Sequence, residues 1–250
     1  MLGEISVIFI RQQRQLLRNP VWVFFGLTQP VLYLVLLGPL LVHVSGGGLG
    51  GNRSWSLFVP GLLLQLVVFT AGFAGFGIIQ ELREGVIDRQ RVTPARRTSL
   101  ILGRALSNVV TIAVQATVLV LAAVPFGLRP SWGGVVASLG LVCMLALGLA
   151  SASYAMGLIL KDEDSFAPFV QSVTLPLLLL SGVILPMTLA PGWLRLVSRV
   201  NPLSHTIDAT RALFVGHYSS GDVAVGVAVT AALAALLTWW GARTFRQSSA

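Results

Sequence analysis

The sequence predicts an all-α integral membrane protein with six transmembrane helices. Charged residues make up only 10% of the 250 residues, and the mean hydropathy is +0.83. These charges are also segregated, since none occurs in six windows: 19–52, 54–80, 105–128, 130–160, 165–194 and 223–242. Each window holds about 20 residues or more, which lets a helix cross a bilayer core of roughly 30 Å. A soluble enzyme, a nucleic-acid-binding domain, a disordered chain and a membrane β-barrel are excluded, because no segment has the composition or alternation they require.

The first 20 residues predict an amphipathic helix lying on the membrane surface. At about 100° per residue, its basic side chains cluster on one face and its apolar side chains on the opposite face. The basic set is Arg11, Arg14 and Arg18, and the apolar set is Leu2, Ile5, Phe9 and Leu16. Asn19-Pro20 ends this helix, since a residue before proline avoids the α conformation. The alternative is an ordinary basic flank that only sets topology.

A membrane domain of residues 21–250 follows, with spans expected at about 21–44, 57–79, 100–126, 135–160, 166–185 and 223–242. Twelve of the 17 Lys and Arg residues then lie on the side of the N-terminus, which predicts both termini in the cytoplasm. This bias also accounts for the net charge of +8 without a nucleic-acid partner. Arg104, near the cytoplasmic end of the third span, is expected to extend its side chain to the interface.

Small residues recur at helical spacing in two spans. The pairs are Ala71/Gly75 and Ser153/Gly157. Such spacings predict close helix packing, either within the chain or between two copies.

The cytoplasmic loop 80–97 is the most polar stretch of the chain. Ile79, Leu82 and Val86 recur at helical spacing, and Pro94 stops a helix there. The pattern favours a short amphipathic helix that presents charge to a soluble partner. A solvated loop kept basic for topology explains the same residues equally well.

The outer connection, residues 186–222, contains two helix-like pieces. Asn201 suits an N-cap and Pro202 the first helical position of the second piece. Asp208 and Arg211 lie three residues apart and are expected to pair. Neither piece is long enough to span, so we expect both to dip into the outer leaflet or to lie on it.

The chemistry of a nucleotide or metal site is absent from the sequence. The single lysine, Lys161, follows leucine rather than a glycine-rich loop, so the chain cannot bind ATP as P-loop proteins do. Its histidines and single cysteine do not form a metal-ligand pattern, and we expect neither a metal site nor an enzyme active site. No ionisable residue lies in the middle of a predicted span, which argues against a proton-driven transporter.

Uncharged polar residues do occur inside the predicted spans. They are candidates for a mildly polar substrate pathway, and for each of them an interhelical hydrogen bond is the alternative. The candidates are Gln65, Asn108, Gln115, Gln171 and Thr174.

Three stretches together resemble the ABC type-2 permease family, most closely its daunorubicin-exporter branch. The first is Arg18-Asn19-Pro20, and the second runs from Glu81 to Arg97 and on to Gly103-Arg104. The third comprises Ser181–Pro186, Pro191–Leu194 and Asn201–Arg211. The likeness covers nearly the whole chain, although Val86 and Gln90 replace the threonine and leucine that are frequent in the family.

The resemblance implies a type V exporter-like fold: an N-terminal interfacial helix, six spans, a coupling helix, and re-entrant helices before the last span. It also implies two permease copies, or a copy and a paralogue, each resting on a separate P-loop ATPase subunit that binds ATP and Mg. Membrane lipids and a small hydrophobic substrate would be the other partners. It assigns ATPase coupling to Glu81, Arg83, Glu84, Gly85 and Arg89, and the outer re-entrant segment to Pro186, Trp193, Asn201, Pro202, Asp208 and Arg211.

The leading hypothesis is therefore the permease subunit of an ATP-driven exporter in the bacterial plasma (inner) membrane. Its substrate would be a hydrophobic or amphipathic compound such as a drug, an antibiotic or a lipid. A polysaccharide or glycolipid exporter of the same fold is the nearest alternative, although aromatic residues are only 8% of the chain. An ion-coupled transporter and an intramembrane enzyme are the others.

Overall fold

The computed structural model describes residues 2–18, 21–44, 51–85, 97–183 and 190–247, and all regular secondary structure in these residues is helical. The all-α prediction is confirmed for this part of the chain. In order, the elements are α1 (Leu2–Arg18), α2 (Val21–Val44), α3 (Gly51–Gly72), α4 (Gly75–Arg83), α6 (Arg97–Ala123), the 3-10 helix η1 (Val124–Phe126), α7 (Trp132–Leu160), α8 (Glu163–Ser181), α9 (Gly192–Val200), α10 (Pro202–Phe214) and α11 (Gly221–Gln247).

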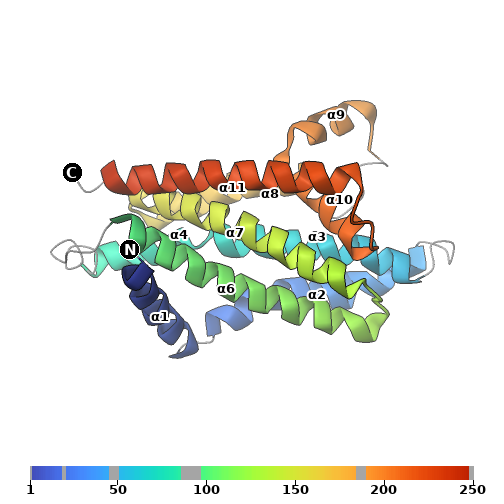
Figure 1. The fold of residues 1–250 in the computed structure, drawn as a ribbon, viewed down its shortest axis with the longest axis horizontal. Coiled ribbons are helices and arrows are strands. Elements are labelled where there is room, and N and C mark those ends of the chain that lie inside the picture. The colour runs from blue at the N-terminus through green and yellow to red at the C-terminus, as the bar shows by residue number, and fades with distance from the viewer. Residues whose placement is uncertain (1, 19–20, 45–50, 86–96, 184–189, 248–250) are drawn as a thin grey trace.

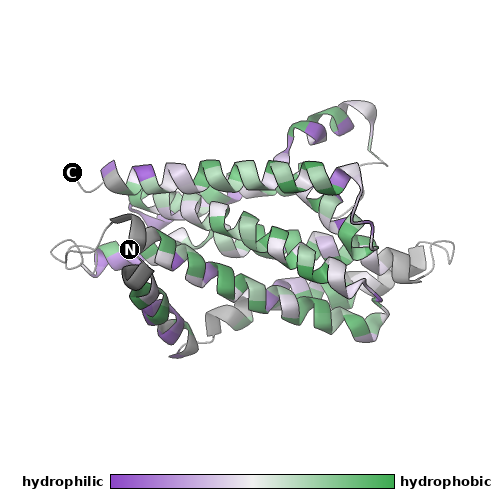
Figure 2. Cartoon of the chain, viewed as in Figure 1, coloured by the Kyte–Doolittle hydropathy of each residue, from purple (hydrophilic) through white to green (hydrophobic). Residues whose placement is uncertain are grey.

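Four stretches of the described residues are long and apolar enough to cross a membrane. They are Trp55–Arg83, Leu102–Phe126, Trp132–Leu160 and Gly221–Phe245. Figure 2 shows apolar residues along these helices and polar residues concentrated in α1, in α9 and near the ends of the bundle. Helix α2 has 24 residues and α8 has 19.

The long helices lie side by side in one bundle, and α1 is steeply inclined to them (Figure 1). At one end of the bundle are α1 and the C-terminus of α4, and at the other are α9 and α10. We call these the α4 end and the α10 end.

Helix α3 forms the centre of the bundle. It packs against α2, α6, α7, α8 and α10, and its middle turns are buried on every side. Val59, Leu63 and Val67 are fully buried. A helix that is apolar all round has to be enclosed in this way or exposed to lipid.

The second predicted span, 57–79, is interrupted. Helix α3 ends at Gly72 and α4 starts at Gly75. One hydroxyl group spans the interruption: Ser153 of α7 donates to the carbonyl of Gly72 and accepts from the amide of Gly75, the latter at 2.8 Å. These are backbone groups that the interruption leaves without their helical partners, so α7 completes the hydrogen bonding of the broken helix.

Close backbone approach makes this arrangement possible. A Cβ atom on Gly75 would lie 2.5 Å from the Ser153 carbonyl oxygen and 2.4 Å from Cζ of Phe166, and one on Gly157 would lie 2.8 Å from the Gly75 carbonyl oxygen. The close packing predicted from Gly75, Ser153 and Gly157 is therefore confirmed within the chain.

The fifth predicted span, 166–185, also differs from the observed helix. Helix α8 runs from Glu163 to Ser181 and ends because Gly182 adopts a left-handed conformation with φ 75°. Glycine reaches this conformation without steric cost, and it commonly terminates helices. Asp162 caps the start of α8 by accepting from the Ser165 amide at 3.1 Å.

We predict that Gly75→Ala destabilises the protein by about 1–3 kcal/mol, because the added methyl group overlaps a backbone carbonyl and a buried ring. Gly77→Ala is the matched control. It lies in the same helix with nothing within 4 Å of the added atom, so it should be neutral or stabilising by up to about 1 kcal/mol. Thermal unfolding of the two variants in nanodiscs measures the difference. Equal stabilities would contradict the packing described here.

Candidate functional site

The residues singled out from the sequence fall in three places: the α4 end, the bundle interior and the α10 end. Two of them, Arg89 and Pro186, lie outside the described residues. Some of the others are buried and bind neighbouring helices, whereas others are exposed at the surface of the chain.

The C-terminus of α4 presents charge at the surface. Arg83 bridges Asp162 at 3.3 Å and Glu163 at 3.2 Å, and its side chain is still 55% exposed. Glu84 is exposed and accepts a hydrogen bond from Gln80 at 2.9 Å. The chain then turns at Gly85, whose φ of 68° suits glycine although a side chain would meet open space. The tip of α4, residues 83–85, therefore fits a docking surface.

Helix α4 itself continues the interrupted second span and ends at Arg83. The docking helix expected between Ile79 and Pro94 thus includes residues that also belong to the bundle, and its continuation beyond Gly85 lies outside the described residues.

Glu81 faces into the bundle, away from the tip. It forms an ion pair with Arg104 of α6, and their side chains are only 17% and 4% exposed. Gln12 of α1 donates to the other carboxylate oxygen of Glu81 at 3.4 Å. Residues 81 and 83 lie about 200° apart around a helix, which explains their opposite directions. The expectation that Arg104 extends to the interface is wrong, because a carboxylate within the bundle binds it.

A second polar contact holds α1 against α6. Gln13 donates from Nε2 to the carbonyl and to the hydroxyl of Ser107, at 3.2 and 3.1 Å. The α4 end therefore joins α1, α4, α6 and the α7–α8 connection through polar side chains, while Arg83 and Glu84 remain accessible.

Asp162 links this network to helix capping. A hydrogen bond from the Ser165 hydroxyl, followed in size by one from its backbone amide, lowers the pKa of Asp162 below its ordinary value. The carboxylate is thus ionised at neutral pH, where it both caps α8 and pairs with Arg83.

The pathway candidates do not form a single lining. Gln65, Gln115 and Thr174 are 7%, 1% and 5% exposed, whereas Gln171 is exposed on the outer face of α8. Gln115 accepts from Thr70 at 3.5 Å, and a Cβ atom on Gly26 would lie 2.6 Å from its Nε2. Gln115 of α6 therefore contacts both α2 and α3 at the place where the three helices meet.

Asn108 is half-buried, and its Oδ1 atom has no hydrogen-bond partner among the described residues. Of the five candidates, Gln171 alone faces outward.

At the α10 end, side chains of α10 satisfy the backbone of α8. Asn201 caps α10 by accepting from the Leu203 amide at 3.0 Å, as its sequence position predicted, and its Nδ2 donates to the Leu177 carbonyl at 2.7 Å. Pro202 is the first residue of α10, as expected. Ser204 donates to the Leu180 carbonyl at 3.2 Å. Leu180 is among the last four residues of α8, whose carbonyls have no helical amide to bind them, and Leu177 lies one residue before these.

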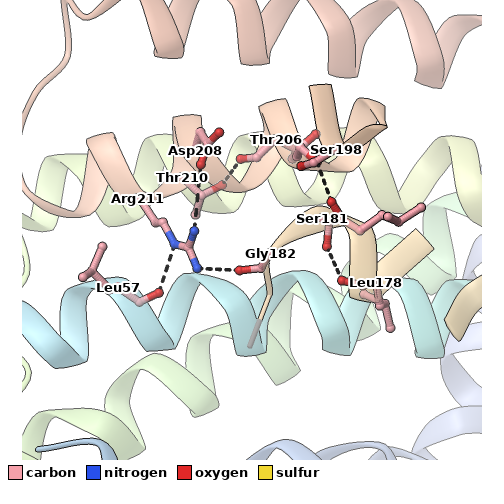
Figure 3. Close-up of polar contacts among 11 residues, drawn as sticks. Leu57, Leu178, Ser181, Gly182, Ser198, Thr206, Asp208, Thr210 and Arg211 are labelled. Atoms are coloured by element: carbon pink, nitrogen blue, oxygen red, sulfur yellow. Dashed lines mark hydrogen bonds and ion pairs between the residues drawn. The ribbon is translucent and has the colours of Figure 1, made fainter. Parts of the chain in front are cut away.

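Arg211 completes the junction. Figure 3 shows its guanidinium pointing from α10 toward α3 and the end of α8. Nε donates to the Leu57 carbonyl at 3.2 Å and Nη2 to the Gly182 carbonyl at 2.8 Å. Asp208 lies 3.9 Å from Nη1 with its side chain 58% exposed, so the expected pair is present but weak. Arg211 therefore acts mainly as a donor to backbone carbonyls of two other helices.

Two residues central to this arrangement were not candidates in the sequence. Ser153 was noted only for its small size and Ser204 only as part of a motif, and yet each donates to a carbonyl at a helix interruption.

Trp193 was a candidate, and it lies on α9 with its side chain 69% exposed. The described residues contain no group of three or more His, Cys, Asp or Glu that could hold a metal ion.

Comparison with known proteins gives a family and several relatives. The family described as "ABC-2 type transporter" matches residues 3–215. The putative transport permease ycf38 of Pyropia yezoensis is 28% identical over 217 residues, which cover 86% of this chain and 75% of the relative. The daunorubicin resistance ABC transporter permease protein DrrB1 of Streptomyces coeruleorubidus is 24% identical over 235 residues, covering 92% and 82%.

A third relative is the probable doxorubicin resistance ABC transporter permease protein DrrC of Mycobacterium tuberculosis. It is 23% identical over 200 residues, which cover 80% of this chain and 72% of the relative. The family match spans most of the chain and includes both the α4 end and α10. The chain belongs to the ABC-2 type transporter family.

Proposed function

We propose that this protein is the membrane permease subunit of an ATP-driven exporter whose ATPase is a separate chain. The observation that carries the proposal is the family match over residues 3–215. The relatives named for daunorubicin and doxorubicin resistance support a hydrophobic or amphipathic substrate, such as a drug, an antibiotic or a lipid. This chain would contribute no catalytic residues, and the partner would bind ATP and Mg.

The proposed architecture has six spans, with α2 and α8 added to the four long apolar stretches. Helix α1 would lie on the cytoplasmic face, which its inclination to the bundle supports (Figure 1). Both termini would be cytoplasmic and the membrane a bacterial plasma membrane. A second copy of the chain, or a paralogous permease, would complete the pathway.

The tip of α4 is the surface that we assign to the ATPase. Arg83 and Glu84 are exposed there and Gly85 adopts the left-handed conformation of the turn. The resemblance assigns Arg89, which lies outside the described residues, to the same coupling role. We assign Glu81 a different part in the coupling, because its pair with Arg104 ties α4 to α6. A push on the tip would reach the spans through this pair and through the junction that Ser153 completes.

Two other transport functions are the alternatives to this proposal. A polysaccharide or glycolipid exporter of the same fold would use the same ATPase surface and a different pathway. An ion-coupled transporter would work without an ATPase. The sequence argues against the latter, because no ionisable residue lies in the middle of a predicted span. The ion pair of Glu81 and Arg104 lies near the α4 end of the bundle.

The proposal predicts that affinity purification from native membranes in mild detergent recovers a P-loop ATPase with this chain. Arg83→Glu should lose most of the bound ATPase while leaving the protein folded, because the side chain is exposed and exposed ion pairs contribute little to stability.

The matched control for that experiment is the double variant Asp162→Asn/Glu163→Gln. It removes the same ion pairs from the other side and keeps a good N-cap on α8, so ATPase recovery should be unchanged. Equal losses in both variants would assign Arg83 to internal structure. Recovery of no ATPase from wild-type membranes, even after cross-linking, would overturn the proposed function.

Gln171 and Gln115 are predicted to differ in their effects. Gln171→Ala should shift substrate preference with little change in stability, because the side chain is exposed on α8. Gln115→Ala should instead lower stability by about 0.6–2 kcal/mol, because it removes an interhelical hydrogen bond. Transport of a panel of drugs by the reconstituted complex, with thermal unfolding of each variant, measures both effects. Unaltered transport of every compound by Gln171→Ala would remove this residue from the pathway.

A further inference from the structure

Helix α9 has three distinct faces. At about 100° per residue, Leu194 and Ser198 lie on one side, the apolar residues Trp193, Leu196, Val197 and Val200 on a second, and Arg195 and Arg199 on a third. The first side faces the bundle: Ser198 is 4% exposed and hydrogen-bonds Ser204 of α10 at 3.0 Å. The residues on the other two sides are exposed among the residues that the structure describes.

The apolar stripe has no cover within the described residues. Trp193 is 69% exposed, Leu196 67%, Val197 44% and Val200 83%. Their spacing, at positions i, i+3, i+4 and i+7, is that of a continuous helix face. Among the described elements, helix α9 packs mainly against α8 and α10, and it stands off from the bundle (Figure 1). An apolar stripe of this kind in water would be costly, so it needs an apolar environment.

The basic face of α9 indicates which kind of apolar environment this is. Arg195 and Arg199 are one turn apart and both are exposed. No aspartate or glutamate occurs between Asp164 and Asp208, so the charged residues of this stretch of the sequence are all basic. Arg195 also donates to the carbonyl of Ala190 at 3.3 Å. An amphipathic helix with a basic face and an aromatic residue on its apolar face is typical of the boundary between lipid headgroups and acyl chains.

We propose that α9 is an interfacial anchor that selects anionic phospholipid at the α10 end. The apolar stripe enters the acyl-chain region beside the bundle, and Arg195 and Arg199 bind lipid phosphates. The hydrogen bond between Ser198 and Ser204, together with the α8 carbonyls bound by α10, fixes this helix to the spans. The proposal requires only that the chain is a membrane protein and does not rest on ATP-driven export.

The anchor is tested with an environment-sensitive fluorophore on single cysteines in the full chain. The native Cys143 is the only cysteine, so Cys143→Ala provides an unlabelled background. Val200→Cys places the probe on the apolar stripe. Gly192→Cys is the matched control, since it starts the same helix on the basic side and an added side chain there meets nothing within 4 Å.

Both labelled proteins are reconstituted in nanodiscs of phosphatidylcholine that contain brominated phosphatidylcholine or brominated phosphatidylglycerol at equal mole fraction. The Val200 probe should be quenched by the brominated chains and the Gly192 probe should not. Quenching at Val200 should be stronger with phosphatidylglycerol, with a local enrichment of about fivefold for each arginine. Arg195→Gln/Arg199→Gln should abolish the preference, and Arg195→Lys/Arg199→Lys should keep it.

Three results would overturn the proposal. Failure of the Val200 probe to be quenched would mean that α9 does not touch lipid. A blue-shifted Val200 probe that resists quenching and cross-links to a second copy would assign the stripe to a protein interface. Equal quenching by the two lipids in the wild-type background would remove the selectivity for anionic headgroups.

Discussion

The fold depends on how backbone groups are satisfied where helices are interrupted inside an apolar bundle. Lipid offers no hydrogen bonds, so every carbonyl and amide freed by an interruption needs a partner from the protein. Two such places stand out in the part of the chain that the structure describes. Ser153 joins Gly72 to Gly75 across the gap between α3 and α4, and Asn201, Ser204 and Arg211 bind the carbonyls at the end of α8.

These two junctions give the ends of the bundle different properties. At the α10 end, donors from α10 hold α8 and α3 together. The residues that α9 packs against are therefore fixed, although α9 itself extends away from the bundle. At the α4 end, the interruption allows α4 to take its own direction, and ion pairs rather than backbone contacts fix its tip. The same helix thus has an inward carboxylate at Glu81, which binds Arg104, and an outward guanidinium at Arg83. The coupling role that we propose for α4 requires both an accessible tip and a link from α4 to the spans.

Much of this architecture follows from the sequence. Charge-free windows contain α2 and the whole of α7, and Asn201-Pro202 marks the start of α10. The interruption at Phe73-Ala74 could not be predicted, because both residues suit a helix and the apolar window 54–80 is continuous across them. It depends on Ser153, which is 78 residues from Gly75 in the chain. The end of α8 had a signal in Gly182, although the apolar residues after it favoured a longer span.

The candidate site was predicted in part. Helical periodicity alone separates Glu81 from Arg83, but the partner of Arg104 is visible only once α4 and α6 are packed together. Gln171 and Thr174 lie three residues apart on α8, one exposed and one buried. Their difference depends on how α8 is rotated against α3, which the composition of α8 does not specify.

The central claim, that side chains replace missing backbone partners at the interruptions, is tested most directly at Arg211. Arg211→Leu keeps an apolar side chain against α3 and removes the donor to the Gly182 carbonyl, which follows the end of α8, at a cost of about 1–3 kcal/mol. The Leu57 carbonyl loses the same donor but lies inside α3. The control is Arg243→Leu on α11, where the guanidinium is exposed and lies over Trp239. In nanodiscs, Arg211→Leu should lower the midpoint of thermal unfolding clearly and Arg243→Leu should not. An unchanged midpoint for Arg211→Leu would contradict the account.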